Sequence, residues 1–169
     1  GLVTDKEVNK MRNFPYIIEQ CKLRLEKDPE NVESIVTLGH IYREIGNLEL
    51  AVENNKKAIE IEPNDCNVHL QLGHTYALLK DNASAKDELR KAIVIGGVDT
   101  DLIVVYLQSI CGSNMQEYTQ ELINLRNMVQ KKCASKSKKG TIEKLDFALA
   151  VIGNKNDLDR VLQQDLAEI

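Results

Sequence analysis

An eight-residue pattern occurs twice in this chain, and the second copy begins 34 residues after the first. Residues Ile35–Tyr42 read IVTLGHIY, and residues His69–Tyr76 read HLQLGHTY. Self-similarity at a fixed period of this length is typical of a protein built from stacked helical hairpins. Further matches at the same spacing lie downstream: Ala51 with Ala85, and Ala58-Ile59 with Ala92-Ile93.

The first copy has the spacing of one face of an α-helix. A glycine inside a helix costs about 1 kcal/mol relative to alanine. We therefore expect Gly39, and Gly73 in the second copy, to allow the close approach of a neighbouring helix. The small and apolar residues of the first copy fall at positions i, i+3, i+4 and i+7 of one stripe: Ile35, Leu38, Gly39 and Tyr42.

Turn signals divide the repeated unit into two helices. Gly46-Asn47 separates the helices of a pair, and Pro63 ends the unit because proline disfavours helix in the residue before it. One pair of helices cannot cover its own apolar face, so units of this kind stack on one another.

These residues resemble the tetratricopeptide repeat (TPR) family. The resemblance implies an all-α fold, a right-handed superhelical solenoid of antiparallel helix hairpins. In this frame, residues 32–65 and 66–99 are two clear repeats. Three further segments are predicted: residues 1–31 as a partial N-terminal repeat, residues 100–138 as a degenerate helical hairpin with a basic loop, and residues 139–169 as a degenerate capping hairpin.

Both ends of the chain depart from the family pattern. When the repeat pattern is shifted upstream by one period of 34 residues, it predicts one helix over about residues 3–12 and a second over residues 15–27. Pro15 then falls in the first turn of the second helix, where its missing N–H is harmless. At the other end, Gly153-Asn154 repeats the Gly46-Asn47 turn and predicts the break between the two helices of the capping hairpin.

Composition narrows the functional classes. The chain has 22 Lys and Arg against 26 Asp and Glu, a mildly acidic balance that argues against nucleic-acid binding as the main task. No apolar run is long enough to span a membrane, and no signal peptide is expected. The four cysteines lie far apart without a CxxC pair, which favours reduced thiols in a cytoplasmic protein. Because the chain begins at Gly1 rather than methionine, we expect it to be a segment of a longer protein.

The family resemblance also implies a binding groove, lined by the first helix of each repeat. His40 and His74 occupy the same position in consecutive repeats, so we expect them to be neighbours there. Two imidazoles could bind a peptide backbone or a carboxylate and titrate near neutral pH; the alternative is that they are polar residues facing water. The expected groove residues are Glu33, Val36, His40 and Arg43, then Asn67, Leu70, His74 and Ala77, then Asp101, Val104 and Gln108.

One subset of the family grips acidic C-terminal peptides with Lys, Asn and Arg side chains. This chain lacks that basic clamp, and Asp101 would repel a carboxylate, so the partner is expected to be a different segment. Val36, Leu70 and Val104 would offer it apolar contacts. The clamp positions correspond here to Val36, His40, Gln71, Asp101 and Val105.

Metal binding and catalysis find little support in the sequence. A zinc site of His40, His74 and Cys66 lacks the tight local spacings of four-ligand sites. His69 aligns with Ile35 on the packing stripe and is expected to be a partly buried core residue. There is no glycine-rich phosphate loop, GxSxG elbow or HExxH motif. We therefore expect no metal, no cofactor and no enzymatic activity.

A basic run over residues 131–140 contains no acidic residue. It could bind an acidic partner or an anionic surface, although such a run is more often a solvated linker. Its lysines are Lys131, Lys132, Lys136, Lys138 and Lys139.

The sequence thus predicts a non-enzymatic scaffold or adaptor that binds a peptide or helix of another protein in a concave groove. One alternative is a self-assembling structural module, that is, a homo-oligomer. The other is a regulatory TPR domain of a larger enzyme or chaperone.

Overall fold

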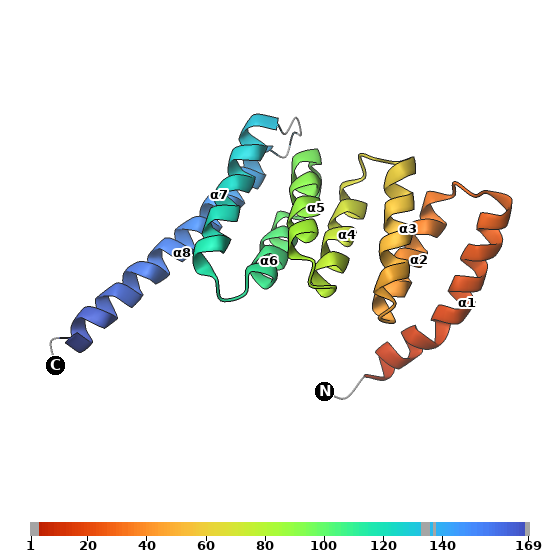
Figure 1. The fold of residues 1–169 in the computed structure, drawn as a ribbon, viewed down its shortest axis with the longest axis horizontal. Coiled ribbons are helices and arrows are strands. Elements are labelled where there is room, and N and C mark those ends of the chain that lie inside the picture. The colour runs from red at the N-terminus through yellow and green to blue at the C-terminus, as the bar shows by residue number, and fades with distance from the viewer. Residues whose placement is uncertain (1–3, 133–135, 137, 168–169) are drawn as a thin grey trace. The chain divides into compact units, whose positions relative to one another are not determined.

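The residues described by the computed structural model form eight α-helices and no strand, so the predicted all-α class is confirmed (Figure 1). The structure describes the backbone of residues 4–132, 136 and 138–167, and the side chains of these residues up to residue 153. The helices are α1 (Asp5–Lys27), α2 (Val32–Glu44), α3 (Leu48–Ile61), α4 (Cys66–Leu78), α5 (Asn82–Ile95), α6 (Thr100–Cys111), α7 (Met115–Lys132) and α8 (Lys138–Ala167).

The chain divides into two units, Gly1–Glu88 and Leu89–Ile169, with the boundary inside α5. In the first unit, α2 and α3 form a hairpin, α1 packs on α2, and α3 packs on α4. In the second unit, α6 and α7 form a hairpin and α8 packs on both of them. The pair α2–α3 falls within residues 32–65, and α6–α7 falls within residues 100–138, the ranges expected for a repeat and a hairpin.

An asparagine or aspartate stands directly before six of the described helices. The Asn31 side chain accepts a hydrogen bond from the backbone N–H of Ser34 at 3.0 Å. The Asp65 carboxylate accepts one from the backbone N–H of Asn67 at 2.9 Å. Each cap satisfies a donor that has no partner within its own helix. The six cap residues are Asn31, Asn47, Asp65, Asp81, Asp99 and Asn114.

The prediction of two N-terminal helices, over residues 3–12 and 15–27, is wrong. Residues Asp5–Lys27 form a single helix with Pro15 inside it. A capping box between Thr4 and Glu7 starts this helix upstream of the proline. Pro15 removes one backbone hydrogen bond and bends the helix without ending it, and Figure 1 shows the bend in α1.

The predicted capping hairpin of residues 139–169 is also wrong, because α8 runs without interruption from Lys138 to Ala167. Gly46 leaves the helical conformation after α2 with a φ of +84°, whereas Gly153 lies inside α8. Glycine costs a helix about 1 kcal/mol but does not by itself break it. The expected loop is shorter as well, since α8 already begins at Lys138.

The core of the first unit joins three consecutive helices. Ile35 of α2, Ala58 of α3 and Val68 of α4 are almost fully buried and pack together. Ile35 and Ala58 come from repeated positions that the sequence singled out, whereas Val68 was not predicted. A hairpin therefore buries its face only when the next helix covers it. In the second unit, the buried residues come from α5, α6, α7 and α8 and include Leu89, Ile93, Ile103, Leu107, Leu122, Leu125, Val129 and Leu145.

The close helix approach that we predicted at Gly39 is confirmed. A Cβ atom at this position would lie 2.5 Å from Oδ1 and 3.2 Å from Cγ of Asn55 on α3. Asn55 is only 1% exposed, so its side chain has little room to move away. The contact explains why the helix tolerates a residue of low helix propensity here.

We expect Gly39→Ala to destabilise the chain. Alanine gains about 1 kcal/mol of helix propensity, but overpacking against a buried side chain costs about 1–3 kcal/mol. Urea unfolding followed by circular dichroism measures the net change. The cost should fall when Gly39→Ala is made in an Asn55→Ala background.

Gly153→Ala is the matched control for this prediction, because no atom lies within 4 Å of a Cβ added there. It should leave stability unchanged or raise it. Equal effects of the two alanines would show that close packing at Asn55 is not the reason for Gly39.

Candidate functional site

The expected groove residues differ widely in how much surface they offer. Those on the first unit come from α2 and α4, and those on the second unit come from α6. Leu70, at 8% exposed, is buried. Glu33, Asn67, Asp101 and Gln108 are exposed, and Val36, His40, Arg43, His74, Ala77 and Val104 are half-buried.

His40 and Arg43 form a fixed pair one turn apart on α2. The guanidinium Nη2 of Arg43 lies 3.0 Å from Nδ1 of His40. A guanidinium can only donate, so Nδ1 carries the lone pair and Nε2 of the neutral ring carries the proton. The Arg43 side chain is 12% exposed and also lies 3.6 Å from a carboxylate oxygen of Glu44.

Arg43 acts on both predicted histidines. Burial lowers the pKa of His40, and the positive charge of Arg43 lowers that pKa further. Burial and the charge of Arg43 lower the pKa of His74 in the same order. Glu44 opposes both shifts. The structure therefore brings His40, Arg43 and His74 into one electrostatic neighbourhood, in which both imidazoles are neutral at pH 7.

Sequence reasoning missed two residues of this neighbourhood, Lys10 and Glu44. Nζ of Lys10 lies 3.8 Å from a carboxylate oxygen of Glu44, and its charge also lowers the pKa of His40. Lys10 reaches this place because α1 continues upstream of Pro15. The capping box at Thr4 was the sequence signal that could have predicted the longer helix.

Two of the three expected apolar contacts belong at least partly to the core. Leu70 is buried, so the expectation that it would contact a partner is not supported by its position. Val36 packs against the cluster of Ile35, Ala58 and Val68 and is only half-buried. Polar side chains therefore make up most of the accessible surface at this place.

In the second unit, Asp101 is already engaged by α8. Nζ of Lys144 lies 2.8 Å from a carboxylate oxygen of Asp101. This interaction raises the pKa of Lys144, and both side chains remain on the surface. Val104 and Gln108 lie further along α6. An anionic partner would therefore meet an ion pair here rather than a lone carboxylate.

His69 is a core residue, as predicted. It is 5% exposed, and its Nε2 donates to the backbone carbonyl of Pro63 at 2.9 Å. Its Nδ1 lies 2.6 Å from a carboxylate oxygen of Glu88 on α5. This pair ties the turn before α4 to the next helix, and Glu88 was not predicted from the sequence.

Two of the described thiols are held in their protonated form. Burial raises the pKa of the Cys21 thiol and of the Cys66 thiol, which keeps both protonated. Among the described residues, no three or more His, Cys, Asp or Glu side chains are grouped as metal ligands. None of the described helices has the length and apolar character needed to cross a membrane.

Two families of repeats match the central part of the chain. The family described as "TPR repeat" matches residues 39–80, and the family described as "Tetratricopeptide repeat" matches residues 67–94. No curated protein matches the chain significantly.

Two solved structures of the protein MamA are similar to the chain. The first has a TM-score of 0.57 at 19% identity, over 95% of this chain and 99% of MamA. The second has a TM-score of 0.58 at 21% identity, over 90% of this chain and 87% of MamA. At these identities the likeness concerns the fold.

The lowered pKa values predict how stability depends on pH. The folded-state pKa values of His40 and His74 lie below the ordinary value of 6.5. As pH falls through about 6.5, the unfolded chain therefore binds more protons than the folded chain. The stability contributed by these two sites is complete above pH 6.5 and is lost as pH falls toward the lowered values.

The free energy of unfolding, measured by urea titration from about pH 7.5 to about pH 5.5, should decrease less in a His40→Gln/His74→Gln variant than in the wild type. Identical slopes in the two proteins would contradict this assignment.

Proposed function

Because this chain carries tetratricopeptide repeats over residues 39–94, we propose that it is a non-enzymatic scaffold that binds a segment of another protein. The surface that it uses is formed by the first helices of consecutive repeats, α2 and α4. Repeat proteins of this kind bind their partners through such extended surfaces. The partner segment is a peptide or a helix.

The observation that carries this proposal is the group formed by His40, Arg43 and His74. Nδ1 of His40 is occupied by Arg43, so the N–H of the ring is at Nε2. No described residue accepts a hydrogen bond from this N–H, and the atom is not buried. A fixed, neutral donor at a half-buried position suits the carbonyl oxygen of a peptide backbone.

The charges in this place favour a main-chain ligand over an acidic tail. Arg43 is paired with Glu44, which offsets its positive charge. Both histidines are neutral at pH 7 because of their lowered pKa values. A strongly acidic segment would therefore gain little here, while a segment presenting backbone carbonyls would gain hydrogen bonds.

Replacing both histidines tests the proposal. We expect His40→Ala/His74→Ala to weaken binding roughly fivefold, for the loss of the hydrogen bond of about 1 kcal/mol that His40 donates. The ligand is a peptide selected by display against the wild-type chain, and its affinity is measured by fluorescence anisotropy.

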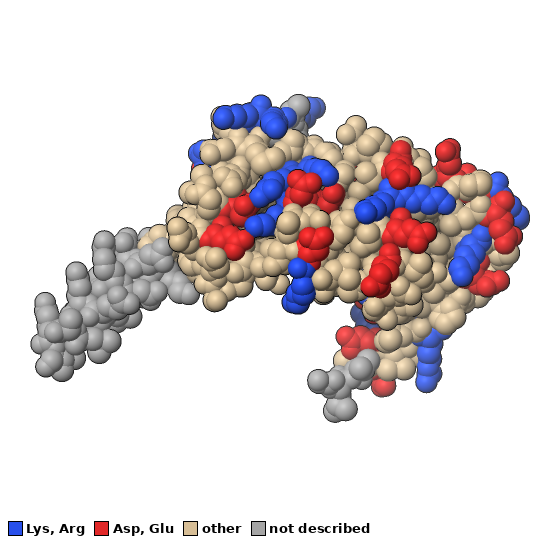
Figure 2. All heavy atoms as spheres, in the orientation of Figure 1, with Lys and Arg blue, Asp and Glu red and all other residues tan. Residues whose placement is uncertain are grey.

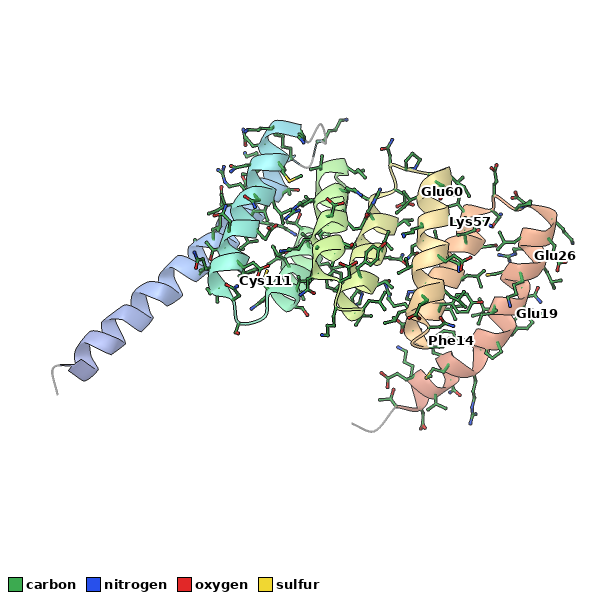
Figure 3. All side chains as sticks on the ribbon, in the orientation of Figure 1. Phe14, Glu19, Glu26, Lys57, Glu60 and Cys111 are labelled. Atoms are coloured by element: carbon green, nitrogen blue, oxygen red, sulfur yellow. The ribbon has the colours of Figure 1, made fainter. Side chains whose placement is uncertain are left out.

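Lys56→Ala/Lys57→Ala provides the control, since both lysines are exposed on α3, where Figure 3 labels Lys57. This variant should bind the selected peptide normally. An unchanged affinity in the histidine variant would remove His40 and His74 from the binding surface.

A second candidate function is self-assembly, and the ends of the described fold favour it. Helix α8 packs on α7 and on α6 in the way that α4 packs on α3 and on α2, so α8 corresponds to the first helix of a repeat. Residues 15–27 of α1 align with α3, the second helix of a repeat. Within the described residues, α8 is not paired with the second helix of its own repeat, and α1 is not paired with the first helix of its own repeat.

Exposed apolar stripes lie on both of these helices. On α8, Phe147 is 72% exposed and Val151 is also exposed. On α1, Tyr16 is 68% exposed, and Leu23 lies on the same stripe. Glu19 and Glu26 accompany them and point away from the rest of the unit in Figure 3. The stripe on α8 begins with the exposed Lys139, whose Nζ lies 3.9 Å from a carboxylate oxygen of Glu143. In this candidate, α8 of one copy pairs with α1 of the next copy.

Two complementary variants test head-to-tail pairing. The wild-type chain should form concentration-dependent oligomers in light scattering, and Tyr16→Glu and Phe147→Glu should each be monomeric. A mixture of the two variants should form a one-to-one dimer, because each supplies the surface that the other lacks. A monomeric wild type would exclude this candidate, and a mixture that stays monomeric would exclude the head-to-tail arrangement.

A further inference from the structure

A depression of about 450 Å³ lies between α5 and α7 in the second unit. It belongs to the second helices of the hairpins, whereas the proposed groove belongs to first helices. Its side chains are Arg90 of α5 and, on α7, Asn124, Asn127, Met128, Lys131 and Lys132.

The depression is rich in hydrogen-bond donors. Oδ1 of Asn124 accepts a hydrogen bond from the side chain of Gln120 at 3.1 Å, so the two amide N–H groups of Asn124 remain as donors. Lys131 and Lys132 are exposed, and neither forms an ion pair with a residue that the structure describes. Residues 131–140 contain no acidic side chain that could neutralise them.

Glu121, a carboxylate of α7 close to this surface, is already bound. Nη2 of Arg90 lies 2.8 Å and 2.7 Å from the two carboxylate oxygens of Glu121, and Glu121 is buried. This charge-assisted contact holds the Arg90 side chain in place. Because Glu121 offsets the charge of Arg90, the net positive charge of the depression comes from Lys131 and Lys132.

We propose that this depression is a second binding surface, separate from the groove, and that it binds an acidic segment of a partner protein. The ammonium groups of Lys131 and Lys132 would contact two carboxylates of that segment, and the amide of Asn124 would donate to one of them. Met128 would contact the aliphatic part of a glutamate side chain. Figure 2 shows Lys and Arg side chains gathered over the end of α7.

The surroundings favour a polypeptide over other anions. Nucleic-acid surfaces interleave cations with aromatic side chains on which bases stack, and no aromatic side chain lines this depression. A membrane-binding surface presents several apolar side chains beside its lysines, and Met128 is the one apolar residue among the lining residues.

The experiment compares two labelled peptides, one of six glutamates and one of six glutamines, by fluorescence anisotropy with the full chain. The glutamate peptide should bind, with an affinity that falls as salt is added because the contacts are between exposed charges. The glutamine peptide should not bind. Lys131→Glu/Lys132→Glu should weaken binding of the glutamate peptide by about tenfold or more, since two attractive contacts become repulsive. Asn124→Asp should weaken it by a smaller factor.

Lys56→Glu/Lys57→Glu is the matched control, because it reverses two exposed lysines on α3 and changes the net charge by the same amount. It should bind the glutamate peptide like the wild type, and circular dichroism should show both variants folded. Equal loss in the two variants, or no binding by the wild type, would overturn the proposal. So would tighter binding of phosphatidylserine vesicles, if the Lys131→Glu/Lys132→Glu variant alone abolished it.

Discussion

The structure depends on the burial of one helix face by the next hairpin. Ile35, Ala58 and Val68 meet from three consecutive helices, and Gly39 lets α2 approach α3 at the buried side chain of Asn55. No single hairpin could exclude water from these residues, so the helices are stable only as a stack. The same arrangement leaves the polar stripe of α2 and α4 free for His40, Arg43 and His74.

Most of the correct predictions from the sequence came from the 34-residue repeat. Period and stripe predicted the helices α2 to α5, the close approach at Gly39 and the burial of His69, because these features follow from local spacing. The two ends could not be predicted in this way. Pro15 and Gly153 are both compatible with a turn, and whether a helix continues through them depends on the capping box at Thr4 and on packing that the repeat does not encode.

The same distinction applies to the candidate site, where repeat spacing predicted some features and contacts between helices determine the others. That His40 and His74 share a neighbourhood followed from their position in consecutive repeats. Their pKa values, the protonated Nε2 of His40 and the role of Lys10 follow from burial and from contacts between elements, which spacing alone does not determine. Leu70 shows the converse case, because its position on the expected groove stripe did not make it accessible.

Pro15 has an effect beyond the shape of α1. With no N–H at this residue, the carbonyl of Met11 loses its helical partner, and the first turns of α1 lie at an angle to the rest. Lys10 lies on that tilted part, where its ammonium group faces Glu44 and contributes to the electric field at His40. Pro15 lies five residues after Lys10 in the sequence. By setting the position of Lys10, it affects the proton affinity of the His40 imidazole on α2.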